Sequence, residues 1–390
     1  MSEWREIILQ DIVEKFIDYR GKTPQKTTSG IPLVTAKIVK NGSILEPSEF
    51  VTEETYKNFM TRGFPKINDV VLTTEAPLGE VALLKDDSVA LAQRIILIRG
   101  KKDILDNAFL KYFLQSEEGQ YRLDSRASGT TVFGIKASIL KEVPILTPIY
   151  QEQKAIAEVL SSLDDKIDLL HRQNKTLEEL AQTLFRQWFI EEADDGWEVG
   201  TLDDIMEFNP THSLKKGEMY PFLEMGNVQT FKSSVADWYE RAFTSGTKFK
   251  NGDTLLARIT PSLENGKTAY VDFLQNDEIG WGSTEFIVMR MKENYHPFIS
   301  YLIARNEDFR EFAIGNMTGS TGRQRAQAKD IKEYEISIPP IKVIEKLNEV
   351  IEPIPIKIKS NSEQIKTLEN MRDTLLPKLM SGESRVKYEK

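Results

Sequence analysis

Two stretches of the chain, one central and one near its C-terminal end, carry the same helical pattern. In residues 152–189, apolar side chains recur at alternating steps of three and four, which keeps them on one face of a helix. Residues 341–382 follow the same rule, and each position lies 191 residues after its counterpart, as Ile351 does after Leu160. Because a helix with such a face needs a partner, each stretch is predicted to pack against the other.

Each helical stretch has one asparagine on its apolar face, Asn174 and Asn361. A buried amide costs about 1 to 3 kcal/mol unless it is hydrogen-bonded. In an antiparallel pair the two amides face each other, and Leu170 meets Ile365 in the same register. In a parallel pair each asparagine faces an apolar residue. We therefore predict antiparallel helices whose register is fixed by Asn174 and Asn361.

The rest of the chain is also duplicated, because residues of the first half recur in the same order 184 to 193 positions later. The matched sets are Trp4, Leu9, Asp11 and Ile12 with Trp197, Leu202, Asp204 and Ile205; Asp69 and Pro77 with Asp253 and Pro261; and Arg99 with Arg290. Short apolar runs bounded by Gly, Pro, Asn and Asp predict strands in both copies. Residues 108–115 and 298–305 are predicted helices at equivalent places.

We expect an α+β fold with two similar globular domains, separated by a pair of long antiparallel coiled-coil helices and related by a pseudo-two-fold axis. A chain of 390 residues is long enough for two cores. The expected divisions are residues 1–151 for the first globular domain, 152–190 for the first helix, 191–341 for the second globular domain, 342–384 for the second helix and 385–390 for a tail.

The charge of the chain is unevenly distributed. The net charge is −9, and residues 191–204 contain seven acidic residues and no basic one, so most of the excess lies in this linker. Two stretches contain no acidic residue: residues 19–45, with five basic residues, and residues 312–329, with three. Each is a candidate basic binding surface, and a solvated lysine-rich face is the alternative interpretation.

Catalytic and cofactor-binding motifs are incomplete in this sequence. Residues 265–268 resemble the end of a phosphate-binding loop, but Pro261 occupies the position of the required upstream glycine. Residues 209–212 begin like the tetrapeptide of amino-methyltransferases, but no glycine-rich cofactor loop precedes them. The three histidines are not at metal-ligand spacing. The acidic residues between 164 and 168 are interpreted as a solvated helix face, and we expect no catalytic, cofactor-binding or metal site.

The chain has no cysteine and no charged-then-apolar leader, and no uncharged apolar run approaches the roughly 20 residues that span a bilayer. These features predict a cytoplasmic protein without disulfides or a membrane segment.

Two similar domains on a helical spacer of about 42 Å favour binding at two places on one extended ligand. Duplex DNA fits this description, because sites one helical turn apart, about 34 to 36 Å, present their major grooves on the same face. A helical scaffold whose end domains bind proteins instead of DNA is the alternative, supported by the acidic linker and the negative net charge. A stand-alone methyltransferase is disfavoured by the missing cofactor loop.

Over essentially its whole length the chain resembles the specificity subunit of type I restriction-modification systems. The resemblance is carried by the Trp-x4-Leu-x-Asp-Ile openings at Trp4 and Trp197, by residues 148–189 and by residues 374–383. It implies a non-catalytic subunit with two target recognition domains, each reading one half of an asymmetric bipartite DNA site. It also implies that the helices dock two methyltransferase subunits, which hold S-adenosylmethionine, and that two motor-endonuclease subunits complete the complex.

The loops of both domains supply candidate DNA contacts, since Arg, Lys, Thr, Asn and Gln are residue types that contact phosphates and base edges. Solvated surface is the alternative for each of them. In the first domain the candidates are Arg20, Lys22, Thr23, Lys26, Thr35, Lys37, Gln93, Arg94, Thr130, Thr131 and Lys136. In the second they are Lys215, Lys216, Asn227, Arg241, Arg258, Lys267, Arg323, Gln324 and Arg325.

Overall fold

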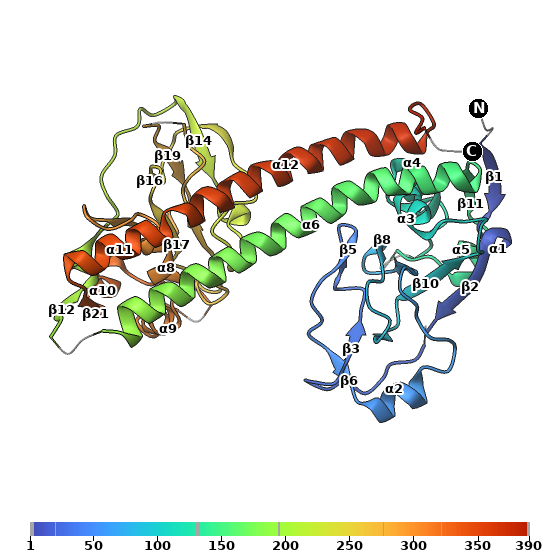
Figure 1. The fold of residues 1–390 in the computed structure, drawn as a ribbon, viewed down its shortest axis with the longest axis horizontal. Coiled ribbons are helices and arrows are strands. Elements are labelled where there is room, and N and C mark those ends of the chain that lie inside the picture. Colours follow the sequence, from blue (N-terminus) through green and yellow to red (C-terminus); the bar gives the residue numbers. More distant parts are fainter. Residues whose placement is uncertain are drawn as a thin grey trace. The chain divides into compact units, whose positions relative to one another are not determined.

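The computed structural model describes residues 4–19, 21–129, 133–193, 196–275, 277–320 and 322–387 (Figure 1). The chain forms two compact units. The first consists of Met1–Ile167 together with Thr367–Lys390, and the second of Asp168–Lys366. The second unit is therefore continuous in sequence, whereas the first is completed by the C-terminal end of the chain.

The first unit is built on a four-stranded antiparallel sheet with the strand order β2-β10-β7-β8. Two smaller sheets, β6-β3-β9 and β1-β11, and the hairpin β4-β5 accompany it. Its strands are β1 (Arg5–Ile8), β2 (Val13–Asp18), β3 (Ile31–Val34), β4 (Val39–Lys40), β5 (Ser43–Ile44), β6 (Phe50–Val51), β7 (Val70–Thr74), β8 (Leu78–Leu83), β9 (Ala90–Leu91), β10 (Ile95–Gly100) and β11 (Pro144–Thr147). Its shorter helices are α1 (Leu9–Ile12), α2 (Glu53–Phe59), α3 (Asn107–Gln115), α4 (Glu117–Asp124) and α5 (Ala137–Lys141).

The second unit repeats this plan with the sheet β13-β20-β17-β18, the pair β12-β21 and a four-stranded sheet β15-β14-β19-β16. Its strands are β12 (Glu198–Thr201), β13 (Met206–Phe208), β14 (Met219–Leu223), β15 (Tyr239–Ala242), β16 (Thr247–Phe249), β17 (Thr254–Ala257), β18 (Thr268–Tyr270), β19 (Gly280–Gly282), β20 (Phe286–Met291) and β21 (Glu335–Ile338). Its shorter helices are α7 (Leu202–Ile205), the 3-10 turn η2 (Met225–Asn227), α8 (Ile299–Arg305), α9 (Glu307–Gly315) and α10 (Ala328–Ile331).

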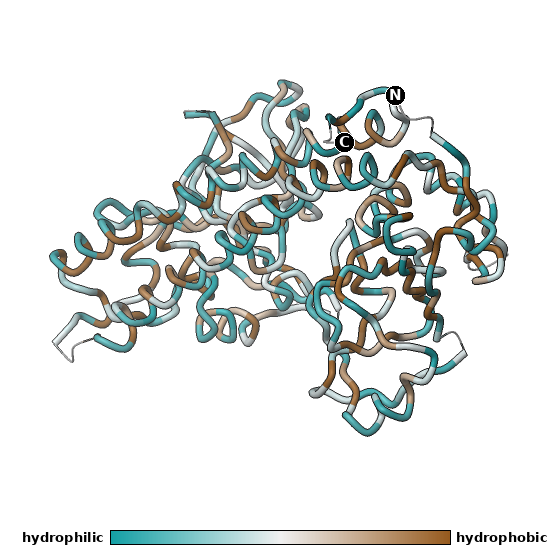
Figure 2. The backbone as a smooth tube through the Cα atoms, turned by 45° about the vertical axis from the view of Figure 1, so that its right-hand side comes forward, coloured by the Kyte–Doolittle hydropathy of each residue, from teal (hydrophilic) through white to brown (hydrophobic). Residues whose placement is uncertain are grey.

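The central strands are apolar on both faces because each main sheet lies between two layers. In the first unit, Val70 and Leu72 pack into a core with α3, whereas Val71 between them packs against β3 and β9. In the second unit, Leu256 packs with α8 and Leu255 faces the core beneath β14. This is the two-residue period of a strand buried on both sides. In Figure 2, hydrophobic residues concentrate along these strands and their covering helices.

The matched residues of the duplicated sequence occupy equivalent places in the two units. Arg99 and Asp69 form a buried ion pair with Nη2 2.6 Å from Oδ2, and Arg290 and Asp253 form its counterpart with Nε 2.7 Å from Oδ1. Both copies also have a cis peptide bond before the matched prolines, Pro77 and Pro261. The predicted α+β fold, the internal repeat and the two equivalent helices, α3 and α8, are confirmed.

The first long helix is α6 (Tyr150–Arg186), and it ends in a π-helical turn, η1 (Gln187–Glu191). The second is interrupted: α11 (Ile341–Ile351) and α12 (Pro353–Met380) are separated at Glu352, where the sequence predicted one helix. Pro353 accounts for the break, because proline has no N–H to donate and restricts the residue before it. The apolar pattern did not reveal the break, since Ile351 and Ile354 on either side are both buried.

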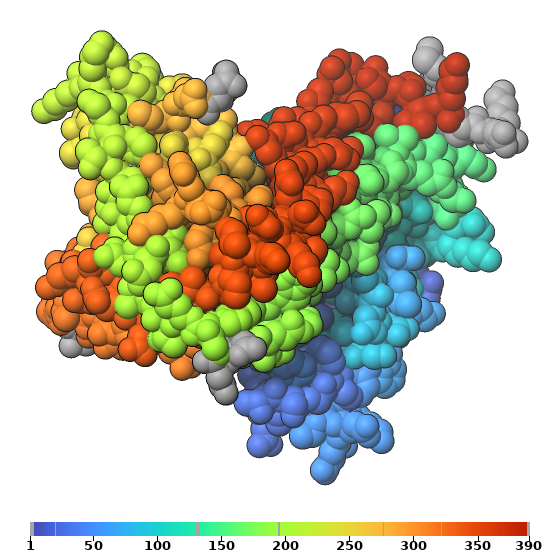
Figure 3. All heavy atoms as spheres, turned by 60° about the vertical axis from the view of Figure 1, so that its left-hand side comes forward, coloured from blue at the N-terminus to red at the C-terminus, as the bar shows by residue number. Residues whose placement is uncertain are grey.

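Within the second unit, α6 and α12 run antiparallel, and the amides of Asn361 and Asn174 meet. The Asn361 amide nitrogen donates to Oδ1 of Asn174 at 2.8 Å, and Asn361 is fully buried. The Asn174 amide nitrogen donates to Oγ of Ser362 at 3.2 Å. Figure 3 shows the orange-red residues of α12 lying against the green residues of α6. The contact that the antiparallel register predicts is therefore present.

Within the first unit, Asp164 on α6 is not a solvated residue, and that interpretation of the sequence is wrong for this position. Its carboxylate accepts from Nζ of Lys111 at 2.6 Å, from the hydroxyl of Tyr112 at 2.7 Å and from Nη1 of Arg372 at 3.2 Å. Burial alone would raise the pKa of Asp164, but the Lys111 ammonium and these donors outweigh burial and lower it. Asp164 thus ties α3 to both long helices.

Asn361→Ala removes the buried hydrogen bond and leaves Oδ1 of Asn174 without this donor, so we expect a loss of about 1 to 3 kcal/mol in unfolding free energy. Denaturant unfolding followed by circular dichroism measures it. Asn370→Ala on the exposed face of α12 is the matched control and is expected to change stability little. Equal stability of the two variants would contradict a structural role for the amide pair.

A second prediction concerns Asp272, whose backbone carbonyl accepts from Lys359 on α12. Burial raises the pKa of Asp272 to about 6, Lys359 opposes the rise, and Glu363 adds to it. The folded chain therefore holds this proton more tightly than the unfolded chain, and the group lowers stability as the pH rises from about 4 through about 6.

Asp272→Asn is expected to stabilise the protein by about 1 to 2 kcal/mol near pH 8, with the gain vanishing near pH 4. Thermal unfolding across this pH range measures the difference. Asp277→Asn, at an exposed position, is the control. A gain of the same size at both ends of the range would exclude titration of Asp272 as its cause.

Candidate nucleic-acid interface

Three segments meet at one end of the main sheet in each unit, and we call this place the three-segment edge. In the first unit they are the end of β7, the residues before β10 and the loop before α5: the Thr74 N–H donates to the Arg94 carbonyl and the Ile135 N–H to the Thr74 carbonyl. In the second unit Arg258 donates to Glu285, and Ala326 donates to Arg258, in the same way. The backbone of the edge is therefore the same in both copies.

In the first unit, the side chains of the edge are an arginine and a glutamate. Arg94 is exposed, has a left-handed backbone with φ of 73°, and places Nε 3.0 Å from Oε1 of Glu75. Gln93 beside it is half-buried, and Lys136 is exposed at the start of α5.

In the second unit, Glu285 occupies the place of Arg94 and Arg325 comes from the loop. The guanidinium of Arg325 binds the carboxylate through two bonds, Nη2 to Oε1 at 2.7 Å and Nε to Oε2 at 2.9 Å. The hydrogen bonds that Arg325 donates to Glu285 raise the pKa of Arg325. Arg258 donates to the side-chain oxygen of Gln327, and Arg323 is exposed beside the pair.

The two edges thus carry ion pairs of opposite polarity at one matched position, Arg94 and Glu285. The partners come from different segments, because Glu75 follows β7 whereas Arg325 lies in the loop. An arginine fork matches the acceptors of guanine, whereas a carboxylate accepts from the amino group of cytosine. Because equivalent positions present Arg94 in one copy and Glu285 in the other, the two edges offer different hydrogen-bonding groups. Glu75 and Glu285 were not among the candidates because only Arg, Lys, Thr, Asn and Gln were considered as DNA-contacting residue types. The alignment of residue 94 with residue 285 at an offset of 191 is the signal that identifies Glu285.

The remaining candidates of the first unit lie apart from the edge or are partly engaged. Lys26 forms an ion pair with Glu49 at 2.8 Å, and Thr35 is half-buried. Lys22, Thr23 and Lys37 are exposed. Arg20, Thr130 and Thr131 lie outside the described residues.

In the second unit, Lys267 and Asn227 meet at the turn η2, where Nζ of Lys267 donates to the Met225 carbonyl at 2.8 Å. Lys215 forms an exposed ion pair with Glu218, and Lys216 is exposed. Gln324 is joined to the edge by its carbonyl, which accepts from the Thr260 N–H at 3.0 Å. The structure therefore brings Arg258, Arg323, Gln324 and Arg325 together.

Arg241 lies on an aromatic platform formed by β14 and β19. Its guanidinium carbon is 4.6 Å from the ring centroid of Phe222 and 5.7 Å from that of Trp281. Arginine held flat on aromatic rings keeps its edge N–H groups available to acceptors.

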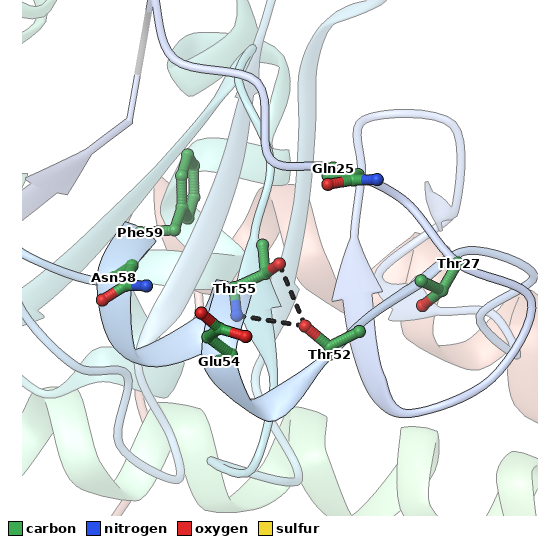
Figure 4. A pocket seen from close by; sticks show the side chains of 7 residues that line it. All are labelled: Gln25, Thr27, Thr52, Glu54, Thr55, Asn58 and Phe59. Atoms are coloured by element: carbon green, nitrogen blue, oxygen red, sulfur yellow. Dashed lines mark hydrogen bonds between the residues drawn. The ribbon is translucent and has the colours of Figure 1, made fainter.

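A surface hollow at α2, shown in Figure 4, is polar but poor in ionisable groups. Its lining residues are Gln25, Thr27, Thr52, Glu54, Thr55, Asn58 and Phe59. Glu54 is the one ionisable residue of this lining, so the hollow has no paired acid and base. In the described part of the chain, no group of three His, Cys, Asp or Glu residues is placed to hold a metal ion.

The tetrapeptide at residues 209–212 has a structural role. The Asn209 side-chain oxygen accepts from the Val288 N–H at 3.0 Å, and Nε2 of His212 lies 2.8 Å from Nη2 of Arg290. Burial and the charge of Arg290 lower the pKa of His212. This segment continues the pairing of β13 with β20 and secures the buried arginine. None of the helices described here is long and apolar enough to cross a bilayer.

Comparison with known proteins decides the family. The family model described as type I restriction modification DNA specificity domain matches residues 1–179 and again residues 194–370. The chain belongs to this family. Its two matches correspond to the two copies of the repeat, so the chain is a type I restriction-modification specificity subunit with two target recognition domains, and the protein-binding scaffold is not favoured.

Similarity to individual relatives supports the same family. The type I restriction enzyme MjaIX specificity subunit of Methanocaldococcus jannaschii is 30% identical over 383 residues, covering 91% of this chain and 87% of the relative. The EcoAI specificity subunit of Escherichia coli is 32% identical over 169 residues, covering 40% of this chain and 27% of that one. The crystal structure of the type I restriction-modification S subunit from M. genitalium has a TM-score of 0.56 at 19% identity and covers 97% of this chain and 96% of its own, which shows a shared fold.

Proposed function

We propose that this specificity subunit reads an asymmetric bipartite duplex, with each unit contacting one half through its three-segment edge and neighbouring loops. The observation that carries the proposal is the reversed ion pair, Arg94 with Glu75 in one copy and Glu285 with Arg325 in the other. A shared backbone with different donors and acceptors is what two different half-sites require. Arg241 and the arginines near residue 325 add positive charge suited to phosphates.

We further propose that the chain is not catalytic and that it acts as one subunit of a larger complex. The family resemblance supports two methyltransferase subunits docked on the long helices and two motor-endonuclease subunits beside them. We assign S-adenosylmethionine to the methyltransferase subunits. Because the complex is proposed to act on cellular DNA, we place it in the cytoplasm. The helix α6, continuous over 37 residues and so about 55 Å long, is suited to a spacer. We assign to Asn174 and Asn361 the role of fixing the register between α6 and α12.

The double variant Arg323→Ala with Arg325→Ala tests the edge of the second unit. It removes two positive charges and leaves the Glu285 carboxylate uncompensated, so we expect an approximately tenfold or greater loss of affinity for the cognate duplex. We also expect a salt dependence flatter by about one to two in log–log slope. Binding of labelled duplex at several salt concentrations, with and without co-expressed methyltransferase, measures both quantities.

Lys15→Gln with Lys102→Gln is the matched control, because it removes the same charge from exposed positions on β2 and after β10, at the end of the main sheet opposite the three-segment edge of the first unit. It is expected to bind as the parent chain does. Unchanged affinity and slope in the arginine variant would exclude this segment, and failure of the parent chain to retain duplex in either state would count against DNA recognition.

Reversing the pair tests which half-site the second unit reads. Glu285→Arg with Arg325→Glu keeps an ion pair but exchanges donor and acceptor at the edge. We expect modified adenines in cells that carry the complex to move to sites altered in one half only, because the first unit is unchanged. Sequencing of methylated adenines measures this outcome, and an unaltered recognition site would contradict base reading by the pair.

A further inference from the structure

A second basic cluster in the second unit lies outside the two acid-free stretches at residues 19–45 and 312–329. Phe231, at the tip of the loop bridged by Val228 and Val235, is 44% exposed. The guanidinium carbons of Arg305 and Arg310 lie 4.5 and 4.9 Å from the centroid of its ring. We call these three residues the Arg-Phe-Arg cluster.

The two arginines of the cluster are only partly satisfied by the described residues. Nη2 of Arg310 donates to the Glu264 carbonyl at 3.1 Å, and Arg305 shares a side-chain hydrogen bond with Tyr301. Nη1 of Arg305 and Nε of Arg310 are buried without an acceptor. Burial and the charge of Arg305 lower the pKa of Arg310, so the two cations destabilise each other. Aromatic contact offsets only part of this repulsion.

The other copy of the repeat has neutral residues at the positions that match the two arginines. Ser116 caps α4 as Asn306 caps α9, which aligns Gln115 with Arg305 and Gln120 with Arg310. Gln120 donates to the carbonyls of Gly79 and Leu114.

The aromatic residue is also particular to the second copy. Gly42, in the turn between β4 and β5, occupies the position of the first copy that matches Phe231. A side chain at Gly42 would collide with the amide of Gln115. Gln115 itself donates to the Val81 carbonyl at 3.3 Å. The first unit thus has neutral amides bonded to the backbone at the two positions matched to the arginines, and the ammonium near Gly42 belongs to Lys111, which is ion-paired with Asp164. The cluster is an addition of the second unit rather than a requirement of the fold.

The cluster adjoins residues already assigned to the interface. The Phe231 N–H donates to the Gly266 carbonyl at 3.2 Å, and the next residue, Lys267, is bridged to Thr230. The turn from Pro261 to Lys267 begins beside Thr260, which is bonded to Gln324 at the three-segment edge. A duplex that contacts the edge therefore has its backbone close to the same turn.

We propose that the Arg-Phe-Arg cluster binds a phosphate of the DNA backbone, as an anchor that the first unit lacks. The inference rests on the proposed DNA recognition. A phosphodiester anion relieves the repulsion between the two guanidinium groups, because its negative charge attracts both. The exposed part of Phe231 supplies an apolar surface for the adjoining sugar. A phosphate carries no base identity, so the contact strengthens binding to any sequence.

The variant Arg305→Gln with Arg310→Gln installs the residues that the first unit uses at the matched positions. We expect about a tenfold loss of affinity at ~0.1 M salt, of equal size for cognate and unrelated duplexes, and a log–log salt slope flatter by about one to two. Fluorescence anisotropy of labelled duplex, with the full chain and its methyltransferase, measures these quantities. Arg305→Lys with Arg310→Lys keeps the charge and is expected to restore most of the slope.

Thermal unfolding establishes that the glutamine variant is folded, and the Lys15→Gln, Lys102→Gln chain gives the effect of removing two charges elsewhere. An unchanged slope in a folded variant, or a change no larger than that of the charge control, overturns the phosphate assignment. Loss of methyltransferase binding with duplex affinity retained would overturn it in favour of a protein contact. If the parent chain binds no duplex, DNA recognition itself fails, and the two failures are distinguishable.

Discussion

We propose that the hydrogen bond between Asn361 and Asn174 selects which residues of the two long helices meet. Apolar side chains on helices slide past one another with little preference, because one leucine contacts another about equally well a heptad away. A buried amide has no such freedom, since it needs a specific partner to offset about 1 to 3 kcal/mol of lost hydration. With Asn361 fully buried and bonded to Asn174, the neighbouring pairs follow, including Ala181 and Ile354 in the core of the second unit.

In the globular units, the residues that stabilise the fold lie apart from the residues that differ between the two copies. The ion pairs Arg99 with Asp69 and Arg290 with Asp253 are buried and alike, and the central strands alternate between the same two layers. Differences gather where the strands end and loops meet, as at Arg94 and Glu285. Loops held by a rigid scaffold can change their side chains at small cost to stability. The Arg-Phe-Arg cluster follows the same rule, because its counterpart in the first unit is a closed set of neutral amides.

Much of the architecture was readable from the sequence. The three-four spacing of apolar residues predicted the helix pair, the asparagines predicted their contact, and the offset of about 190 residues predicted the repeated sheet. What periodicity could not provide was the surroundings of single polar groups. Asp164 read as solvated because its donors, Lys111 and Tyr112 on α3 and Arg372 on α12, lie far away in sequence. Pro353 interrupts a helix whose apolar pattern continues unbroken.

The candidate DNA contacts were also predictable from the sequence only in part. Residue type and local charge suggested Arg258, Arg323 and Arg325 separately, and the structure places them with Gln324 at one edge. Glu285 was not accessible to a search for positive charge, although it sets the position of Arg325 through two hydrogen bonds. The cation pair at Phe231 depends on a contact between a loop near residue 230 and a helix near residue 305, and no local pattern encodes it.

The division of the chain into a continuous unit and an interrupted one has a consequence for its synthesis. Asp168–Lys366 is complete once those residues have left the ribosome, whereas the first unit lacks Thr367–Lys390 until those residues have also been made. Arg385 reaches Glu152, 233 positions earlier, and Leu379 enters the core that contains Leu160. The unit whose synthesis begins first is therefore the unit that is completed last.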